Sequence, residues 1–428
     1  AMGTRTSIWA GTAAFVTALG SLLVAGPTTA GAASSPADQG VTATTIAVGL
    51  PYVNFEALKS LGVTINDGSF PDAYNGVIGM INKAGGVNGR KLVLSMAEMN
   101  PSVPAEATSS CTQLTEDDHV FVAIAPVFPD CYQQTHLTPV LMGSLPGALP
   151  ADVPPDFSLV PPNANFDPLQ LAAFKKAGDF KGKKVAIFYG ADSDAPEVKV
   201  VQNSLKKLGV PVALTAEDSV QATDAVASDQ EVQSISQRFQ SAGVNVVIGV
   251  GGSGSTTWPR AQFDNQSTYK PLYIATDESA LISYVESTKG ANPYLKYVVA
   301  ASTAPTFYQQ WKDPAIQKCV SAVKKAYPTD TITPPVNPTS PGAGSSTDTT
   351  YTSVVEACQY LALFDDIAKA AGKNLTVASF TKAGFALKNA DIPGIGPVSF
   401  GPGQPYATGP VTIFKYDSTS ETLVPASS

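Results

Sequence analysis

The feature that most constrains the fold of this chain is a repeated alternation of short apolar segments with amphipathic ones. Thr45–Leu50, Leu92–Met96 and Val120–Ala125 have the length and composition of β-strands, and helical patterns lie between them. Val120–Ala125 is apolar on both faces, which is typical of a central parallel strand covered by helices. The same order starts again at Lys184–Tyr189 and runs to Pro271–Ala275. Two such blocks predict an α/β fold with two doubly wound parallel sheets.

The section that follows the two blocks is expected to be mostly helical. Within it, Pro334–Thr350 is poor in apolar residues and predicts a mobile surface loop. Pro397–Phe400 and Val411–Tyr416 alternate around a Gly/Pro-rich turn and predict a terminal hairpin. Inside the second block, the spacing of Ser228 and Glu231 is typical of a capping box at the start of a helix.

Charge and histidine content argue against two function classes. The chain has 27 Lys and Arg residues against 35 Asp and Glu residues, a formal net charge of −8. This balance repels a phosphate backbone, so we expect no nucleic-acid partner. Hydrolytic catalysis has little support, because His119 and His136 are the only histidines and no G-x-S-x-G motif occurs. We expect no enzymatic activity, no catalytic residue, no metal and no cofactor.

Residues 1–32 have the order of a secretory signal peptide. Arg5 is basic, Ile8–Val24 is almost wholly apolar or small, and Ala30-Gly31-Ala32 supplies an A-x-A cleavage site. The alternative is a membrane anchor, because about 18 apolar residues can just span a bilayer. Cleavage is favoured because the small residues follow at once and no basic stop-transfer cluster does. We expect an exported protein, periplasmic or extracellular, that is soluble after cleavage and has no lipobox cysteine.

Four cysteines in an exported chain favour two disulfides. They are Cys111, Cys131, Cys319 and Cys358. A metal site is the alternative, because both histidines fall near the first two cysteines, but their spacings match no zinc pattern. Pairing of sequence neighbours is the simplest connectivity, and the spacing alone leaves it open. Cys319 and Cys358 each lie on a helical apolar stripe, so their pairing would staple two packed helices.

Ligands of doubly wound sheets bind beyond the carboxyl ends of the strands. Asp277 and Glu278 come directly after Pro271–Ala275, where they could meet a ligand ammonium or amide. The alternative is a helix start, in which Asp277 is the N-cap and Glu278 interacts favourably with the helix dipole. Tyr189 ends another strand and Asp192 follows it, so the same two interpretations apply to that segment.

A glycine-rich segment follows one strand of the second block. Residues 249–254 read Gly-Val-Gly-Gly-Ser-Gly and fit the G-x-G-x-x-G pattern of a dinucleotide-binding turn. The motif lies deep in the second block, and Asp264 follows Gly254 too closely for the acidic residue of that motif. We therefore expect a glycine-rich loop that faces a cleft. Backbone amides there, at Gly252 and Ser253, could hold a ligand carboxylate.

Asn75 and the run Ile81–Lys91 (INKAGGVNGRK) resemble the IN-x-A-GG-V-x-GR segment of type I extracytoplasmic solute-binding proteins of ABC transporters. The closest likeness is to the group that binds leucine, isoleucine and valine. The resemblance implies a periplasmic binding protein type I fold, in which two α/β lobes close on a small molecule that lies between them. It also implies an ABC transporter permease as partner and no catalysis.

The same resemblance implies how the chain is divided. Three crossovers would join the lobes, near residues 160–165, 300–304 and 394–397. The N-terminal lobe would contain residues 41–161 and 304–394, and the C-terminal lobe residues 162–303 and 395–428. The pair Cys111 and Cys131 is similar to the single disulfide common in that group.

Two departures from the family pattern bear on the ligand. Pro51–Asn54 (PYVN) replaces a G-P-L-[ST]-G turn, and Pro126–Pro129 (PVFP) replaces small hydroxyl residues. With fewer donors and the rings of Tyr52, Phe128 and Tyr189, the site is predicted to prefer a bulky, partly apolar ligand, either an aromatic or alicyclic compound or a large apolar amino acid. The candidate ligand-binding residues are Tyr52, Asn54, Val127, Phe128, Ser144, Tyr189, Asp192, Gly252, Ser253, Asp277 and Glu278.

Three functions remain open at this point. Delivery of a small molecule to an ABC importer is favoured, by a chain that is expected to be monomeric. A ligand sensor or scavenger of the same fold is the second, and the presence of neighbouring permease genes would separate these two. An exported enzyme is the third, and turnover of an ester, amide or nicotinamide substrate would support it.

Overall fold

The computed structural model describes residues 39–55, 57, 65–100, 103–125, 131–132, 139–143, 156–190, 195–220, 224–345, 348–407 and 409–426. The predicted signal peptide, residues 1–32, lies outside these ranges. Four candidate ligand-binding residues and one of the two histidines also lie outside them: Val127, Phe128, Ser144, Asp192 and His136.

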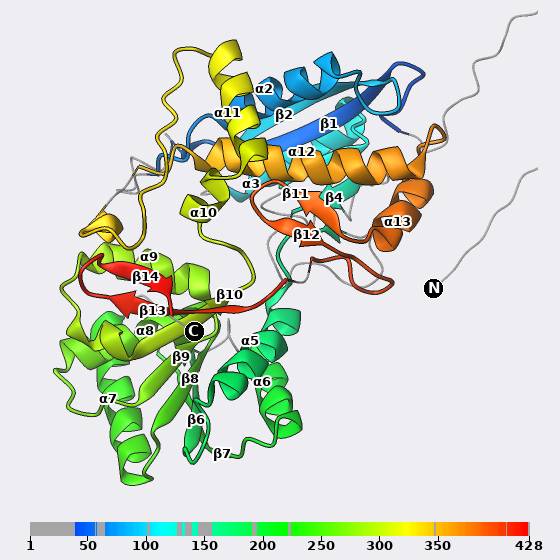
Figure 1. The fold of residues 1–428 in the computed structure, drawn as a ribbon. Coiled ribbons are helices and arrows are strands. Elements are labelled where there is room, and N and C mark those ends of the chain that lie inside the picture. Colours follow the sequence, from blue (N-terminus) through cyan, green and yellow to red (C-terminus); the bar gives the residue numbers. More distant parts are fainter. Residues whose placement is uncertain are drawn as a thin grey trace, which may run out of the picture. The chain divides into compact units, whose positions relative to one another are not determined.

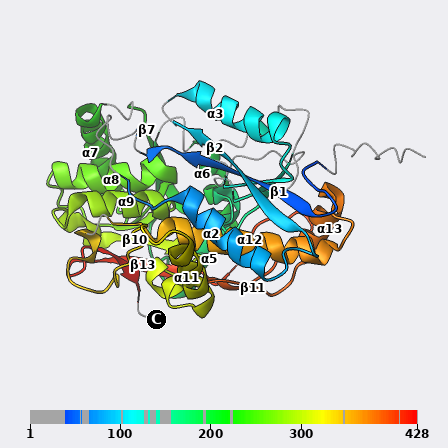
Figure 2. The same cartoon turned by 90° about the horizontal axis from the view of Figure 1, so that it is seen from above.

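The first sheet is parallel and has five strands in the order β2-β1-β3-β4-β5 (Figure 1). These strands are β1 (Thr45–Val53), β2 (Lys91–Met99), β3 (Val122–Ile124), β4 (Val140–Met142) and β5 (Asp156–Phe157). Figure 2 shows α3 on one face of this sheet and α2, α11 and α12 on the other. These helices are α2 (Phe70–Lys83), α3 (Pro104–Thr112), α11 (Pro314–Ala326) and α12 (Thr352–Ala371).

The side chains of β1 point alternately to the two faces of this sheet, so the strand contributes to the packing on both sides. Ile46, Val48 and Leu50 are buried in the large core that contains the apolar faces of α2, α11 and α12. Ala47 points the other way and packs in a small cluster with Leu114, which follows α3. Burial on both faces explains why these strands are predominantly apolar.

The second sheet has seven strands in the order β14-β13-β10-β9-β8-β6-β7. Its parallel strands are β6 (Val185–Gly190), β7 (Val212–Asp218), β8 (Val246–Val250), β9 (Leu272–Ala275) and β10 (Val298–Ser302). Its helices are α5 (Asn163–Ala177), α6 (Ala195–Lys207), α7 (Ala225–Ser241), α8 (Gly251–Asp264) and α9 (Glu278–Thr288). Apolar side chains of α5 and α6 form one core, and those of α7, α8 and α9 form another. The predicted fold class, α/β with two doubly wound parallel-sheet lobes, is confirmed.

The predicted terminal hairpin is wrong. β12 (Gly396–Val398) pairs with β11 (Ala390–Ile392), and β13 (Thr412–Asp417) pairs antiparallel with both β10 and β14 (Thr422–Pro425). The predicted partners therefore belong to different sheets. Alternation along the sequence identified strand-like segments, but their partners lie elsewhere in the chain, and local patterning cannot specify them.

The predicted capping box at Ser228 is also wrong. α7 begins one turn earlier, because the side chain of Asp224 accepts a hydrogen bond from Ala227 N at 3.0 Å. Ser228 is buried and donates to Asp218, while Glu231 accepts a hydrogen bond from the hydroxyl of Ser219. Both side chains therefore tie α7 to the end of β7 instead of capping the helix.

The segment Pro334–Thr350 was expected to be a mobile surface loop, and its described part is anchored instead. Gly342 N donates to Thr419 O at 2.9 Å, and Gly344 N donates to Ser420 O at 2.7 Å. These two acceptors lie in the turn between β13 and β14. The segment, which we call the strap, is thus attached by its backbone to the hairpin at the edge of the second sheet.

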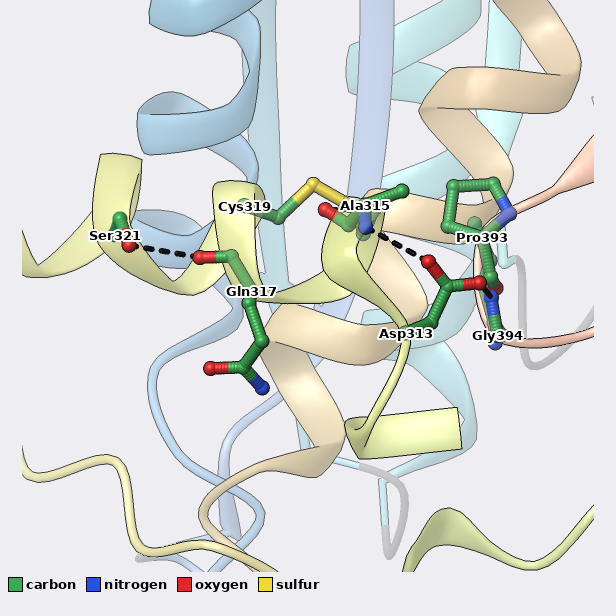
Figure 3. Close-up of a disulfide and its surroundings, with 9 residues drawn as sticks. Asp313, Ala315, Gln317, Cys319, Ser321, Pro393 and Gly394 are labelled. Carbon is green, nitrogen blue, oxygen red and sulfur yellow. Dashed lines mark hydrogen bonds between the residues drawn. A yellow bond between two sulfur atoms is a disulfide. The ribbon is translucent and has the colours of Figure 1, made fainter. Parts of the chain in front are cut away.

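The second pair of cysteines forms the predicted staple between two helices. Cys319 of α11 is bonded to Cys358 of α12, with 5.9 Å between their Cα atoms. Figure 3 shows Asp313 beside this disulfide, at the start of α11. The Asp313 side chain accepts from Ala315 N and from Gly394 N, each at 2.7 Å. One carboxylate thereby caps the helix and holds the turn between β11 and β12.

The first pair, Cys111 and Cys131, is also bonded, with a Cα–Cα distance of 6.2 Å. Cys111 is buried near the end of α3 and packs with Ala123 of β3. His119 is exposed in the turn before β3 and belongs to no metal-binding group of the described residues. Both disulfides therefore cross-link segments that belong to the region of the first sheet.

Candidate functional site

Candidate residues of the second block meet at the carboxyl edge of the second sheet. Tyr189 lies in β6 opposite Val250 of β8, and Gly252 and Ser253 form the first turn of α8. Asp277 and Glu278 follow β9, the next strand along. A Cβ atom placed on Gly252 would lie 3.5 Å from Asp277 Oδ2. Parallel strand ends have thus brought three separate sequence segments together.

Asp277 is the N-cap of α9. Its side chain accepts a hydrogen bond from Ala280 N at 2.9 Å, and its own N–H donates to Ser255 Oγ at 3.0 Å. The capping interpretation of this residue is therefore observed. Its other carboxylate oxygen, Oδ2, lies on the side of Gly252.

Glu278, in the first turn of α9, is partly buried and lines a cavity. Burial raises the pKa of its carboxyl to about 7, and the neighbouring charge of Asp277 adds to the shift. The favourable helix dipole at this position does not offset the loss of hydration. Glu278 is therefore poised between its neutral and ionised forms near neutral pH.

Asp167 of α5 is a component of this edge that the sequence analysis missed. It is fully buried, and its Oδ1 accepts a hydrogen bond from Gln170 Nε2 at 3.0 Å. Its Oδ2 has no hydrogen-bond partner among the described residues. Burial raises the pKa of Asp167 to about 8, and the charges of Glu197 and Asp277 raise it further. No local pattern revealed this residue, because only the docking of α5 turns it toward the end of β9.

The glycine motif has a packing role. Gly254 lies so close to β8 that an added Cβ would be 3.0 Å from the carbonyl carbon of Gly249. Tyr273 of β9 donates its hydroxyl proton to the Gly254 carbonyl, and a Cβ on Gly249 would collide with that hydroxyl. The glycines therefore let α8 approach the sheet closely, which is a sufficient reason for the motif without a dinucleotide.

At the carboxyl edge of the first sheet, Tyr52 and Asn54 share one acceptor. Tyr52 Oη donates to Glu98 Oε2 at 2.9 Å, and Asn54 Nδ2 donates to Glu98 Oε1 at 2.7 Å. Tyr189 repeats the arrangement in the second sheet, where its hydroxyl donates to Glu217 Oε2 at 3.1 Å. In both sheets the tyrosine lies directly opposite the glutamate of the adjacent edge strand.

Tyr360 of α12 also reaches the edge of the first sheet, and Glu356 of the same helix contacts α2; sequence reasoning missed both. Gly143, which follows β4 with a φ of +73°, leaves room for the Tyr360 ring, because an added Cβ would lie 2.3 Å from it. Glu356 accepts a hydrogen bond from Tyr74 Oη at 3.0 Å, and burial raises its pKa to about 7. Both residues lie on a helix whose apolar face carried the stronger sequence signal.

A cavity of about 400 Å³ lies beside Glu278. Its walls come from α9, the connection between β10 and α10 (Phe307–Trp311), the strap, and the β13–β14 hairpin. This volume is within the range of small-molecule sites. Among the described helices, none is long and apolar enough to cross a bilayer.

Comparison with solved structures shows the same fold. A substrate-binding protein from Desulfitobacterium hafniense in complex with Leu is 14% identical, with a TM-score of 0.60 over 89% of this chain and 100% of the other. A fatty acid ABC transporter substrate-binding protein from Thermomonospora curvata is 17% identical, with a TM-score of 0.57 over 90% and 92%. A solute-binding protein from R. palustris in complex with 4-hydroxybenzoate is 14% identical, with a TM-score of 0.59 over 90% and 96%.

No curated protein matches this chain. The sequence pattern of one family does, over residues 65–421, which is most of the chain. With two doubly wound sheets, strand ends that carry polar side chains and a cavity of ligand size, the chain belongs to the periplasmic binding protein family, a family of non-enzymatic binding proteins.

Proposed function

We propose that this protein captures a small, partly apolar molecule at the carboxyl ends of its strands and delivers it to an ABC importer. The observation that carries this proposal is Glu278, a partly buried carboxylate at a strand end that also lines a cavity of ligand size. A carboxylate in such a position can form a charge-assisted hydrogen bond with an amine or hydroxyl of the ligand.

The apolar part of the ligand is assigned to the aromatic rings at the strand ends. Tyr52 and Tyr189 are held by Glu98 and Glu217, so their hydroxyls already have acceptors, and their rings are partly buried against the core of each sheet. Val127, Phe128, Ser144 and Asp192 stay predictions of the sequence. Leucine and 4-hydroxybenzoate, which two proteins of the same fold bind, are partly apolar too, and this supports the ligand class.

We further propose that residues 41–161 and 304–394 form one lobe, that residues 162–303 and 395–428 form the other, and that hinge closure buries the ligand. The strands between residues 45 and 157 form one sheet and those between 185 and 302 form another, which supports this division. Export by a cleaved signal at residues 1–32, a monomeric state and a permease partner complete the proposal.

Thermal unfolding with added ligands tests the ligand class. Leucine and phenylalanine, which carry an ammonium beside an apolar side chain, are expected to raise the Tm, because a ligand that binds only the native state stabilises it. Glycine and urea, at concentrations below those that denature, serve as the small polar set. Stabilisation by the polar set alone would refute the proposed ligand class.

A further inference from the structure

The cavity beside Glu278 has two facing walls that differ in origin. Ser279, Ile282, Ser283 and Glu286 are spaced three or four residues apart, so they form one face of α9. The other wall is the strap, which contributes Pro335, Val336 and Pro338. Because the strap is hydrogen-bonded to the β13–β14 turn, this wall is fixed and not a loose flap.

The charged residues that line the cavity are all acidic. They are Glu278, Glu286 and Asp348, and among the described lining residues there is no Lys or Arg. Asp348 accepts hydrogen bonds from Thr333 Oγ1 and Thr350 N, and these lower its pKa, so it is ionised at neutral pH. The cavity therefore has a negative potential and favours a cation.

Aromatic side chains supply the remaining part of a cation site. The rings of Phe307 and Tyr351 lie 5.2 Å apart, and Phe307 is 41% exposed although it is large and apolar. Burial raises the pKa of Tyr351 to about 12, and the charges of Glu286, Asp67 and Asp348 raise it too. These carboxylates are thus close enough to influence the ring that a cation would contact.

The cavity is also lined by Phe414, which is buried, and by the ring of Tyr308. The ammonium of Lys312 already lies over it, 3.9 Å from its centroid. The available faces are therefore those of Phe307 and Tyr351, and ring faces attract cations through their quadrupole.

We infer that the cavity between α9 and the strap binds an organic cation, namely a protonated amine carried on an apolar body, with the strap as the outer wall. The amine lies near Glu278 and Glu286. Because Tyr52 and Tyr189 are not among the residues that line this cavity, the apolar body packs here on Phe307, Tyr351 and Val336 instead of on those two rings. This inference rests on the proposed function, because it names the ligand class for a site that includes Glu278.

Calorimetric titration with three probes of one shape tests the inference. Phenethylamine is cationic, 2-phenylethanol is neutral and phenylacetate is anionic at pH 7.5. We expect the amine to bind at least about tenfold more tightly than the alcohol, because ring faces and carboxylates both favour it. Phenylacetate is expected to bind most weakly of the three.

Two variants locate the binding. Val336→Lys puts an ammonium into the outer wall, and we expect it to lower the amine affinity by about tenfold through like-charge repulsion. Val226→Lys is the matched control, because Val226 is 70% exposed on α7 and outside the cavity. Glu286→Gln is expected to weaken the amine about threefold or more and the alcohol less than twofold. Its control is Asp391→Asn, which removes the same charge from an exposed side chain of β11, outside the cavity.

The outcomes separate this inference from the proposed function. If leucine or phenylalanine stabilises the protein but amine and alcohol bind equally, the inference is overturned and the proposed function stands. Equal effects of Val336→Lys and Val226→Lys on the amine overturn it as well. If none of the probes or ligands binds, both are overturned.

Discussion

The two sheet regions of this protein are stabilised in different ways. Around the first sheet, two disulfides cross-link segments that pack on it, and the polar groups at the end of β1 satisfy one another through Glu98. The second sheet region has no disulfide, since all four cysteines of the chain are used by the first. Its edge instead gathers three carboxylates, Asp167, Asp277 and Glu278, and the pKa values of Asp167 and Glu278 are raised by burial and by the charge of Asp277.

This difference suggests a division of labour. A polar group that is already paired contributes rigidity, whereas a buried carboxylate without enough donors is destabilised until a ligand donates to it. We therefore expect the first region to be the more rigid support and the second to distinguish between ligands. The following predictions test this contrast in order of decreasing effect.

Removal of the Cys319–Cys358 bond by serine at both positions is expected to lower the free energy of unfolding by about 3 kcal/mol. Removal of Cys111–Cys131 should cost about 0.6 kcal/mol less, because the loop that it closes is shorter. Urea unfolding measures both changes. Amide exchange should become faster around the first sheet and not in β6, β8 and β9; equal acceleration in both regions would contradict the contrast.

Asp167→Asn is expected to stabilise the protein at pH 8 by about 2 kcal/mol and to have little effect at pH 4. The folded-state pKa of Asp167, about 8, is above its unfolded value, so the unfolded state releases this proton first and wild-type stability falls as pH rises between about 4 and 8. Asparagine keeps the acceptor for Gln170 without the charge. Urea unfolding across this pH range measures the difference, with Asp391→Asn as control.

A wild-type pH slope that the Asp167→Asn variant shares would show that Asp167 is not the group responsible. The contrast between the two regions would then lose its strongest electrostatic support. If the free energy of unfolding becomes less dependent on pH in Asp167→Asn and not in the control, the contrast between the two regions is supported.

Glu278→Gln is expected to remove the pH dependence of amine binding. With a pKa of about 7, Glu278 gains its charge as pH rises from 6 to 8, so wild-type affinity for phenethylamine should increase about threefold to tenfold over that range. The variant should bind weakly and equally at both pH values. Calorimetric titration at pH 6 and pH 8 measures both affinities. If the affinity of the variant changes with pH as much as that of the wild type, a group other than Glu278 is responsible.

The smallest effect is expected at the two tyrosine–glutamate pairs. Glu98→Gln weakens the acceptor for both Tyr52 and Asn54, while Glu217→Gln affects Tyr189 alone. We expect losses of about 1 and about 0.5 kcal/mol respectively, since both sites are solvent-exposed. Thermal unfolding of the two variants gives the comparison, and a larger loss for Glu217→Gln would reverse the proposed order of rigidity.

Local patterns predicted most strands because burial on both faces leaves a strong apolar signal at segments such as Val120–Ala125. The helical stripes around Cys319 and Cys358 likewise predicted the staple. The choice of partner strand was not predictable in this way. β13 was assigned to a hairpin with the segment at 397–400, and it pairs instead with the adjacent β14 and with the distant β10. The strap was expected to be a mobile loop because it is poor in apolar residues. It is held by backbone hydrogen bonds to the β13–β14 turn, and amino-acid composition does not reveal such bonds.

At the candidate site, sequence reasoning found residues that directly follow a strand, such as Asp277 and Glu278. It missed Asp167 and Glu356, which lie on helices. Asp167 is hydrogen-bonded to Gln170, which donates to Thr276 O just after β9, and Glu356 accepts from Tyr74 of α2. Val127, Phe128, Ser144 and Asp192 stay predictions.

The sequence by itself determined the order of strands and helices, the expectation of two disulfides and the acidic character of the chain, because these follow from periodicity, cysteine count and charge. Only the tertiary structure decided which carboxylates share one edge, which glycines let α8 approach β8, and that the strap forms a cavity wall with α9. Those features arise from contacts between residues far apart in sequence, and the free energy of such contacts depends on burial and on neighbouring charges that no single segment contains.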